Sequence, residues 1–456
     1  MRSPDAAMRL LMARSGVLLL LAMASVLAYL TRHSLAVANT TIQLELKINN
    51  EQFGYLYSIF SFGYMLFQIP AGWVGQKLGV RFVLPSMAIL WSLMTFATAY
   101  VPTFAGLLIV RFLFGLAQAG LVPNQALAIR DWISDAGRGV SSAVMVVAMS
   151  VGSIASLSLT SQLLKNYPWR SIFVGYSFLG VAWAILFAVV YRATPEKSHW
   201  LQCDAIKPPD VPTDQTNLPE SSPPTLALGT NVEPASSREE GTSTAPRPLS
   251  RLRLGVSLLG LSVQAMLKAA GYNLAVTFLP ALLEYIHHVP PQETGRFVTG
   301  ALVLFILGSM LGGGLLQWAY QVTGSKYISR SVIAAVMLTI AGGCTALAGY
   351  GETVMATVVW LAIGAFFSGL ASAAPWVAVM DIGGRNTAVI MAFMNSFAAL
   401  GGVLLSPLLG RLIDVIKATD GDWSLVFLLH GAYYLVAAVS WLFVDPNQSC
   451  NQSGDP

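Results

Sequence analysis

Residues 15–36 read SGVLLLLAMASVLAYLTRHSLA, an almost unbroken apolar stretch that decides the class of this protein. A helix needs about 20 mainly apolar residues to cross a bilayer, because lipid offers the backbone no hydrogen-bond partners. The stretch is longer than the ~7–15-residue apolar core of a signal peptide, so we expect an uncleaved first membrane span. Unusually for a span, it ends with a basic pair, Arg32 and His33.

The composition of the whole chain has the same character. Of its 456 residues, 55% are hydrophobic and 11% are charged, whereas soluble domains carry roughly 25% charged residues. This composition argues against soluble enzymes and nucleic-acid-binding proteins, whose surfaces need charge, and the net charge of +4 does not alter that conclusion. The three cysteines are far apart and show no metal-binding or disulfide spacing, so neither metal nor cofactor is expected.

Twelve stretches are long and apolar enough to be spans. Their ranges are 15–36, 52–74, 82–100, 104–129, 139–163, 170–191, 254–282, 296–320, 329–349, 354–379, 388–413 and 424–444. The predicted fold class is therefore an all-α integral membrane protein with twelve transmembrane helices in two six-helix bundles, over 1–192 and 251–456. Residues 193–250 between them are rich in Pro, Ser, Thr, Asp and Glu, which predicts a disordered linker. Paired bundles of this kind are typical of secondary transporters.

Basic residues predict the orientation of the spans. With the N-terminus inside, the inner segments hold 17 of the 26 Lys and Arg residues. Because basic residues concentrate in cytoplasmic loops, we expect both termini and the linker to be cytoplasmic in a multi-pass protein of the plasma (cell inner) membrane.

Three cations lie within predicted spans, namely Arg32, Arg111 and Lys268, and no Asp or Glu lies in a span to pair with them. A basic side chain at a span centre costs about 2.5–3.5 kcal/mol on insertion scales, so such residues usually line a functional cavity. Snorkelling of the side chain to the membrane surface is the alternative, and it suits Arg111 best. A cavity with unpaired cations predicts a negatively charged substrate and disfavours cationic drugs and neutral sugars.

Polar residues at helical spacing accompany these cations. Span 1 carries Tyr29 and His33 beside Arg32. Span 2 carries one stripe of polar residues, Tyr57, Ser61, Tyr64 and Gln68. Each polar side chain taken singly could instead serve helix packing. The candidate substrate-binding residues are Arg32, Lys268, Arg111, Tyr29, Tyr64, Gln118, Tyr57, Tyr272 and Asn395.

The residues around these positions resemble the major facilitator superfamily and, within it, the anion:cation symporter family of sugar-acid carriers, vesicular glutamate transporters and sialin-like proteins. The matching segments are Tyr29-Leu30-Thr31-Arg32, Gly63-Tyr64, Gln68-Ile69-Pro70-Ala71-Gly72, Arg111-Phe112-Leu113-Phe114-Gly115, Pro168-Trp169-Arg170-Ser171-Ile172-Phe173 and Asp381-Ile382-Gly383-Gly384-Arg385-Asn386-Thr387. The resemblance implies that Arg32 binds a substrate carboxylate, and that Gly72, Gln76, Gly79 and Arg81 form the family's conformational loop motif. Lys268 falls where vesicular members have an arginine.

The chain also departs from the family pattern. Proton-coupled sugar-acid members carry acids where this chain has Thr31 and Gln118, and the loop motif usually has an Asp at the position of Gln76. The departure at Gln76 predicts a weaker charge contact between the bundles. His33 is the remaining coupling candidate, although the neighbouring Arg32 disfavours its protonated form. Facilitated diffusion, anion exchange and coupling to a proton or sodium ion therefore all stay open.

We expect a secondary transporter for a small organic anion, such as the carboxylate of a sugar acid. It would work by alternating access, in which the binding site opens first to one side of the membrane and then to the other. A pair of cations on spans 1 and 7 also resembles organophosphate:phosphate antiporters, so an organophosphate or anion exchanger is one alternative, and a receptor that does not transport is another. An enzyme is not expected, because the spans hold no acid/base constellation. The expected partners are the anion and the lipid bilayer, without nucleic acid, and the chain is expected to act as a monomer.

Overall fold

The computed structural model describes residues 4–48, 50–192, 248–273, 279–289, 291–419 and 421–448. The part before residue 193, which we call the N-half, contains one 3₁₀ turn, η1 (Asp135–Gly137), and eight α-helices. These helices are α1 (Pro4–Val37), α2 (Asn39–Leu46), α3 (Asn50–Leu78), α4 (Val80–Tyr100), α5 (Phe104–Gln118), α6 (Leu121–Trp132), α7 (Arg138–Leu163) and α8 (Trp169–Val190).

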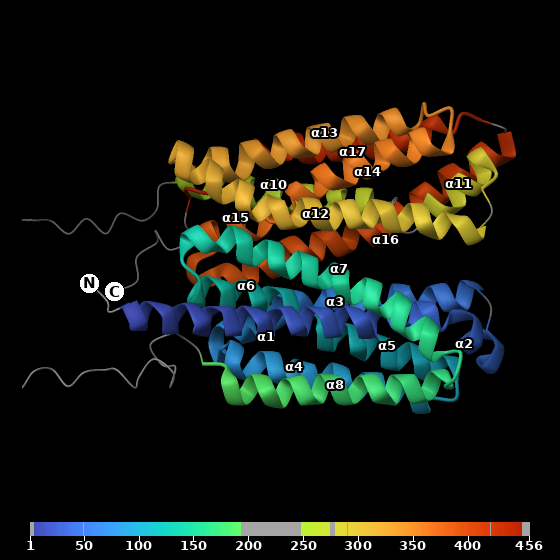
Figure 1. The fold of residues 1–456 in the computed structure, drawn as a ribbon, viewed down its shortest axis with the longest axis horizontal. Coiled ribbons are helices and arrows are strands. Elements are labelled where there is room, and N and C mark those ends of the chain that lie inside the picture. Colours follow the sequence, from blue (N-terminus) through green and yellow to red (C-terminus); the bar gives the residue numbers. More distant parts are fainter. Residues whose placement is uncertain are drawn as a thin grey trace, which may run out of the picture.

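The part from residue 248 onward, the C-half, repeats this pattern of long helices. It contains α10 (Pro248–Asn273), α11 (Leu279–His287), α12 (Pro291–Thr323), the π-helical turn η4 (Ile328–Val332), α13 (Ile333–Ala348), α14 (Val354–Leu370), α15 (Ala374–Gly383), the 3₁₀ turn η5 (Gly384–Asn386), α16 (Thr387–Thr419) and α17 (Ser424–Trp441). No strand occurs among the described residues. Figure 1 shows the N-half helices lying beside the C-half helices, with the long axes roughly parallel. The predicted linker, 193–250, lies almost entirely outside the described ranges.

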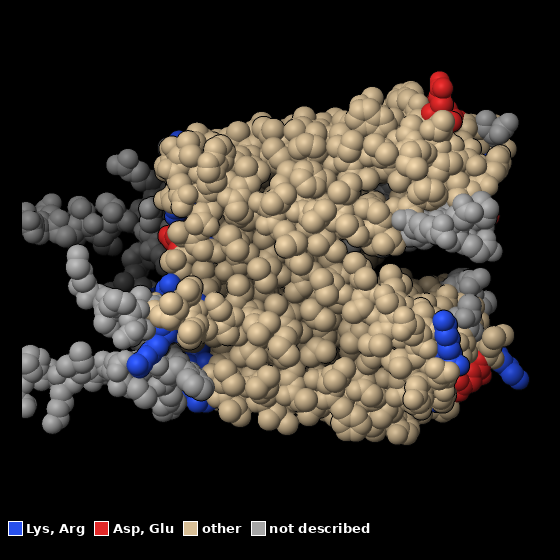
Figure 2. All heavy atoms as spheres, in the orientation of Figure 1, with Lys and Arg blue, Asp and Glu red and all other residues tan. Residues whose placement is uncertain are grey.

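The outer surface is that of a membrane protein. Ten stretches of the described residues are long and apolar enough to cross a bilayer, and one of them, Val354–Thr419, combines the predicted spans 354–379 and 388–413. The predicted span 52–74 is not among the ten, although α3 covers it, because the tyrosines, serines and glutamines of α3 lower its mean hydropathy. Figure 2 shows charged side chains only at the two ends of the visible face. The wide uncharged band between them fits the apolar core of a bilayer.

Two predicted spans are interrupted helices. The span 104–129 is divided between α5 and α6, and the span 354–379 between α14 and α15. Each break lies four residues before a proline, at Ala119 before Pro123 and at Ala371 before Pro375. A proline ring clashes with the carbonyl four residues earlier and provides no N–H for it, which explains both breaks.

The halves meet chiefly where α3 packs on α16 and α7 on α12, and α6 also packs against α16. At the end of the bundle where α1 and α15 lie in Figure 1, which we call the closed end, these pairs touch through glycines. A Cβ atom on Gly139 of α7 would lie 2.7 Å from the Gly313 carbonyl oxygen of α12, and one on Gly72 would lie 2.7 Å from the Ala388 oxygen. The helices can therefore approach this closely only because these positions have no side chain.

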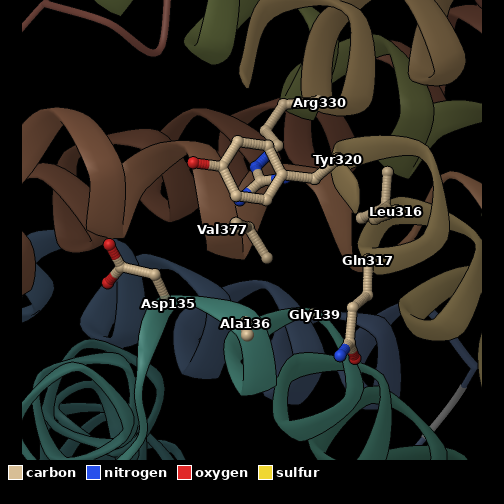
Figure 3. Close-up of a pocket in the computed structure, with 8 residues that line it drawn as sticks. All are labelled: Asp135, Ala136, Gly139, Leu316, Gln317, Tyr320, Arg330 and Val377. Carbon is tan, nitrogen blue, oxygen red and sulfur yellow. The ribbon is translucent and has the colours of Figure 1, made fainter. Parts of the chain in front are cut away.

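A buried carboxylate anchors the closed end. The Asp381 side chain is fully buried and lies 3.2 Å from Arg330, 3.4 Å from Lys326 and 3.7 Å from Arg138. Arg138 begins α7, so its contact joins the N-half to the C-half. Figure 3 shows the Arg330 guanidinium behind the Tyr320 ring, across a small cavity from Asp135, Ala136 and Gly139 of the N-half. This cavity has a volume of only about 10 Å³, about the minimum for one water molecule, so little space is left between α7 and α12 at this point.

The loop motif after α3 also reaches across the halves. Gln76 donates a hydrogen bond of 2.8 Å to the Arg385 carbonyl oxygen in η5, and Arg130 donates to the neighbouring Gly384 carbonyl oxygen. An aspartate at position 76 has no N–H to donate to this carbonyl. The sequence predicted a weaker charge contact here because of Gln76, and the contact found is a neutral hydrogen bond between the halves. Gly79 has φ 84° in the turn before α4, whereas Arg81 lies over the Phe82 ring and makes no described contact across the halves.

At the opposite end, which carries α2 and α11 and which we call the open end, the halves separate on the face seen in Figure 2. There the Trp169-Arg170 motif fastens α2 to the N-half. Glu45 accepts a hydrogen bond of 2.6 Å from the Trp169 indole and one of 2.8 Å from Arg170, and Arg170 also donates to the Ala99 carbonyl oxygen at 2.5 Å.

Replacing Gly313 by Leu should force the closed end apart, because even a Cβ atom there lies 2.4 Å from the Gly139 oxygen. A cysteine placed at the buried position Val377 should then react several-fold faster with a water-soluble maleimide, in a chain whose Cys203 and Cys450 are Ser. Gly314→Leu is the matched control, since a Cβ atom at Gly314 meets nothing within 4 Å. Equal reaction rates in the two variants would show that the glycine contact does not seal this end.

Replacing Asp381 by Asn should destabilise the protein, because it leaves Arg330, Lys326 and Arg138 without their shared counter-charge. Removing one member of a buried ion pair costs about 3–5 kcal/mol, so the Tm in detergent, followed by tryptophan fluorescence, should fall clearly. Glu352→Gln changes an exposed acid and should leave the Tm within experimental error. A Tm for Asp381→Asn equal to that of Glu352→Gln would contradict the anchoring role.

Candidate functional site

Arg32, on the inner face of α1, is held by neutral groups. Its guanidinium carbon lies 4.4 Å from the ring centre of Tyr29, 4.7 Å from that of Tyr64 and 5.1 Å from that of Phe60. Its Nε donates a hydrogen bond of 3.0 Å to Gln118 Oε1. Its Nη2 is buried and has no hydrogen-bond partner in the described part of the chain. Arg32 is thus a fixed cation with a free donor.

Gln118, near the end of α5, orients Arg32. Its Nε2 donates to the Ala28 carbonyl oxygen at 3.1 Å and to Thr31 Oγ1 at 3.3 Å. With the amide nitrogen committed to α1, the amide oxygen must face the guanidinium. Gly115, one turn earlier on α5, lets α5 pack closely against α3, because a Cβ atom there would lie 2.3 Å from the Phe60 carbonyl oxygen.

Tyr64 connects this cluster to the C-half. Asn395 of α16 donates hydrogen bonds to the Tyr64 hydroxyl at 3.0 Å and to Gln68 Oε1 at 2.7 Å. The face of the Tyr64 ring is covered by Arg32 and its hydroxyl is held by the other half of the molecule. Arg32 is therefore linked to the α3–α16 interface through Tyr64, which contacts both Arg32 and Asn395.

Lys268 of α10 lies in a separate cavity of about 210 Å³ within the C-half. The cavity walls include Phe305, Trp376 and Met394, and two buried polar atoms face no partner, Gln264 Oε1 and Ser372 Oγ. Lys268 itself makes no hydrogen bond or ion pair with the described residues. This cavity offers an ammonium donor, a hydroxyl and a carbonyl acceptor on an apolar background.

The other predicted residues lie outside these two clusters. Arg111 is only 3% exposed, stacks over Phe114 at 5.1 Å and has two buried nitrogens without partners among the described groups. Tyr57 interacts with it electrostatically, but no described contact joins Arg111 to Arg32. The His33 ring lies 5.8 Å from the Tyr29 ring. Tyr272 lies on α10, but its side chain is outside the described residues.

Sequence reasoning missed part of this arrangement. Phe60, Ser372 and Trp376 were not predicted, because apolar and small polar residues of these types are common in any membrane helix. Gln68 stood on a predicted polar stripe, but nothing in its spacing distinguished it from a packing residue. In the described part of the chain, no three His, Cys, Asp or Glu side chains gather as a metal site would require.

Comparison with known proteins identifies the superfamily to which this architecture belongs. The model of the Major Facilitator Superfamily matches residues 21–405. The chain belongs to this superfamily. Solved members agree with the fold: the Escherichia coli fucose:proton symporter in the outward conformation has a TM-score of 0.63 at 16% identity, covering 95% of this chain and 99% of that one. The proton:xylose symporter has a TM-score of 0.69 at 12% identity, covering 95% and 97%. These likenesses establish the major facilitator fold and a multi-pass membrane protein.

Curated superfamily members similar in sequence are transporters with anionic substrates in their names. A probable sulfoacetate transporter of Cupriavidus necator is 24% identical over 425 residues, covering 92% of this chain and 91% of the relative. The hexuronate transporter of Bacillus subtilis is 24% identical over 436 residues, covering 94% of each chain. A probable L-galactonate transporter of Escherichia coli is 24% identical over 433 residues, covering 94% of this chain and 89% of the relative.

Replacing Asn395 by Leu should destabilise the α3–α16 interface, because it leaves the Tyr64 hydroxyl and the Gln68 amide buried without partners. An unsatisfied buried polar group costs about 1–3 kcal/mol, so the Tm should fall. Ser396→Ala removes, across the same interface, only the longer bond of 3.3 Å to the Met65 oxygen, together with a bond of 2.9 Å to Ala392 in its own helix, and should have a smaller effect. A Tm of Asn395→Leu above that of Ser396→Ala would show that the Asn395 bonds do not hold the halves.

Proposed function

We propose that the protein is a secondary transporter that carries a small hydroxylated organic anion, of the sugar-acid type, across the cell membrane. The observation that carries the proposal is the free Nη2 of Arg32, a buried donor on a cation that no acid compensates. A carboxylate is the natural partner of such a donor, because it accepts charge-assisted hydrogen bonds from guanidinium. The names of the relatives support an organic anion as substrate, and they lend no support to an organophosphate carrier or to a receptor that does not transport.

The C-half cavity suits the remainder of such a substrate. A hydroxyl group can accept a hydrogen bond from Lys268 and donate one to Gln264 Oε1, and Ser372 can act in either direction. A sulfonate or a second carboxylate could only accept, and would leave the Gln264 oxygen unpaired. The Trp376 and Phe305 rings provide apolar surface for the C–H faces of a sugar chain. Lys268 then adds long-range attraction for the negative charge.

The two halves act as the moving units in this proposal, with the domain boundaries 1–192 and 251–456 expected from the sequence. Arg32 lies in the N-half and Lys268 in the C-half, so a substrate that contacts both draws the halves together at the open end. The closed end, with Arg130, Arg138, Lys326, Arg330 and Arg385, faces the cytoplasm by the positive-inside rule. The state described here is then an outward-facing one, in the plasma (inner) membrane.

Counterflow is the direct test of this function. Purified protein is placed in sealed liposomes loaded with unlabelled galactonate, glucuronate or sulfoacetate, and the same labelled anion is added outside. We expect saturable accumulation of at least one labelled sugar acid above that in protein-free liposomes. Labelled fucose, a neutral sugar, serves as the control for charge selectivity. Accumulation of neither galactonate nor glucuronate would contradict the proposed sugar-acid substrate, even if sulfoacetate accumulated.

Substitutions of the two cations should separate charge from geometry. Arg32→Lys keeps the charge but loses the bidentate fork, and we expect the half-saturating concentration in counterflow to rise about tenfold, equivalent to about 1.4 kcal/mol. Lys268→Met removes the charge and should weaken uptake similarly. Lys165→Met changes an exposed lysine beyond α7 and should behave as the parent protein. Unchanged uptake in both site variants would rule out these two residues as the anion site.

A further inference from the structure

We propose that the carrier is an obligate exchanger: its anion-loaded form changes sides readily, its empty form does not, and each anion taken up is matched by one released. This inference rests on the proposed function and concerns its mode. It comes from the charges of the two candidate anion contacts in the empty protein, Arg32 in the N-half and Lys268 in the C-half cavity, which differ from those at the closed end.

Arg32 and Lys268 have no charged partner among the described residues. Arg32 is surrounded by an amide oxygen and three aromatic rings, and its Nη2 has no partner among the described residues. Lys268 has no ion pair in the same part of the chain. Such contacts orient a cation but do not cancel its charge.

The chain has no acid at this depth that a rearrangement could bring to these cations. No Asp or Glu occurs in residues 6–44, 52–130, 136–195, 241–283, 294–351, 353–380 or 382–413. These ranges include the segments that line both clusters. At the closed end the situation is the opposite, since the Asp381 carboxylate lies within 4 Å of three cations.

A transporter changes sides through a state in which its site is shut off from water on both sides. In that state an unpaired buried cation loses its hydration and gains no ion pair to replace it. Burying a charge in this way is costly in a membrane protein. A bound anion removes this cost by pairing with Arg32 and Lys268. A carrier with a carboxylate beside its arginine can return empty, because that carboxylate replaces the substrate. Here the replacing group is the uncharged amide of Gln118.

The exchange mode is measured by varying the inside of the vesicle. Uptake of the labelled anion that shows counterflow is compared in vesicles loaded with the same unlabelled anion and in vesicles loaded with Tris chloride only. We expect initial uptake to be about tenfold or more faster with the internal anion. A potassium diffusion potential set with valinomycin should not change the exchange rate, because one anion replaces another of the same charge. Equal rates with and without internal anion would overturn the exchanger, while the proposed function would stand.

A variant tests the charge argument itself. Gln118→Glu places a carboxylate beside Arg32 Nε and supplies the missing counter-charge, so we expect measurable uptake into vesicles without internal anion. Gln118→Met is the control: like the Glu variant it loses the amide bonds to Ala28 and Thr31, and it adds no charge beside Arg32, so uptake should still require internal anion. Failure of Gln118→Glu to gain such uptake while it retains counterflow would overturn the proposal. Absence of counterflow for all three anions in the parent protein would overturn the proposed function and the exchanger with it.

Discussion

The constraint on which the structure depends is the cost of an unpaired cation inside a membrane protein. The fold meets this cost in two different ways. At the closed end, Asp381 compensates Arg330, Lys326 and Arg138, and the halves are held in contact there. Between the ends, Arg32 receives hydrogen bonding and ring contacts but no counter-charge, and Lys268 and Arg111 have no described acid partner either. The compensated cations stabilise the fold, and Arg32 is left able to bind an anion through its free Nη2.

The closed end shows how charge and steric fit combine. Gly139 and Gly313 let α7 and α12 approach until their backbones touch, and only at that distance can Arg138 of the N-half reach Asp381 of the C-half. The hydrogen bonds from Gln76 and Arg130 to the η5 carbonyls add directional contacts at the same level. Because these bonds all depend on the same close approach, they are expected to form and break together as the halves move.

The sequence predicted the features that repeat along one helix. Hydropathy located the helices, and helical spacing placed Tyr29 beside Arg32, because both depend on local periodicity. The breaks before α6 and α15 were within reach of the sequence, since Pro123 and Pro375 mark them. Contacts between distant segments were not. The Asn395–Tyr64 bond joins residues 331 positions apart, and the polar groups around Lys268 come from helices whose rotation the sequence does not specify. Arg111 illustrates the limit, because its burial was foreseen as one possibility and its separation from the Arg32 cluster was not.

Thr31 and Gln118 connect the fold to the mode of transport. A protonatable acid at either position would couple the charge of the empty cavity to pH, whereas the amide and hydroxyl found here keep Arg32 oriented by hydrogen bonds alone. The network among Gln118, Thr31 and the Ala28 carbonyl lies within the N-half, so it can persist while the halves move. If the halves move as proposed, Arg32 keeps its orientation, and neither Thr31 nor Gln118 beside it can gain or lose a charge. According to this argument, binding of the anion, rather than of an ion elsewhere in the protein, controls when the halves can change from one conformation to the other.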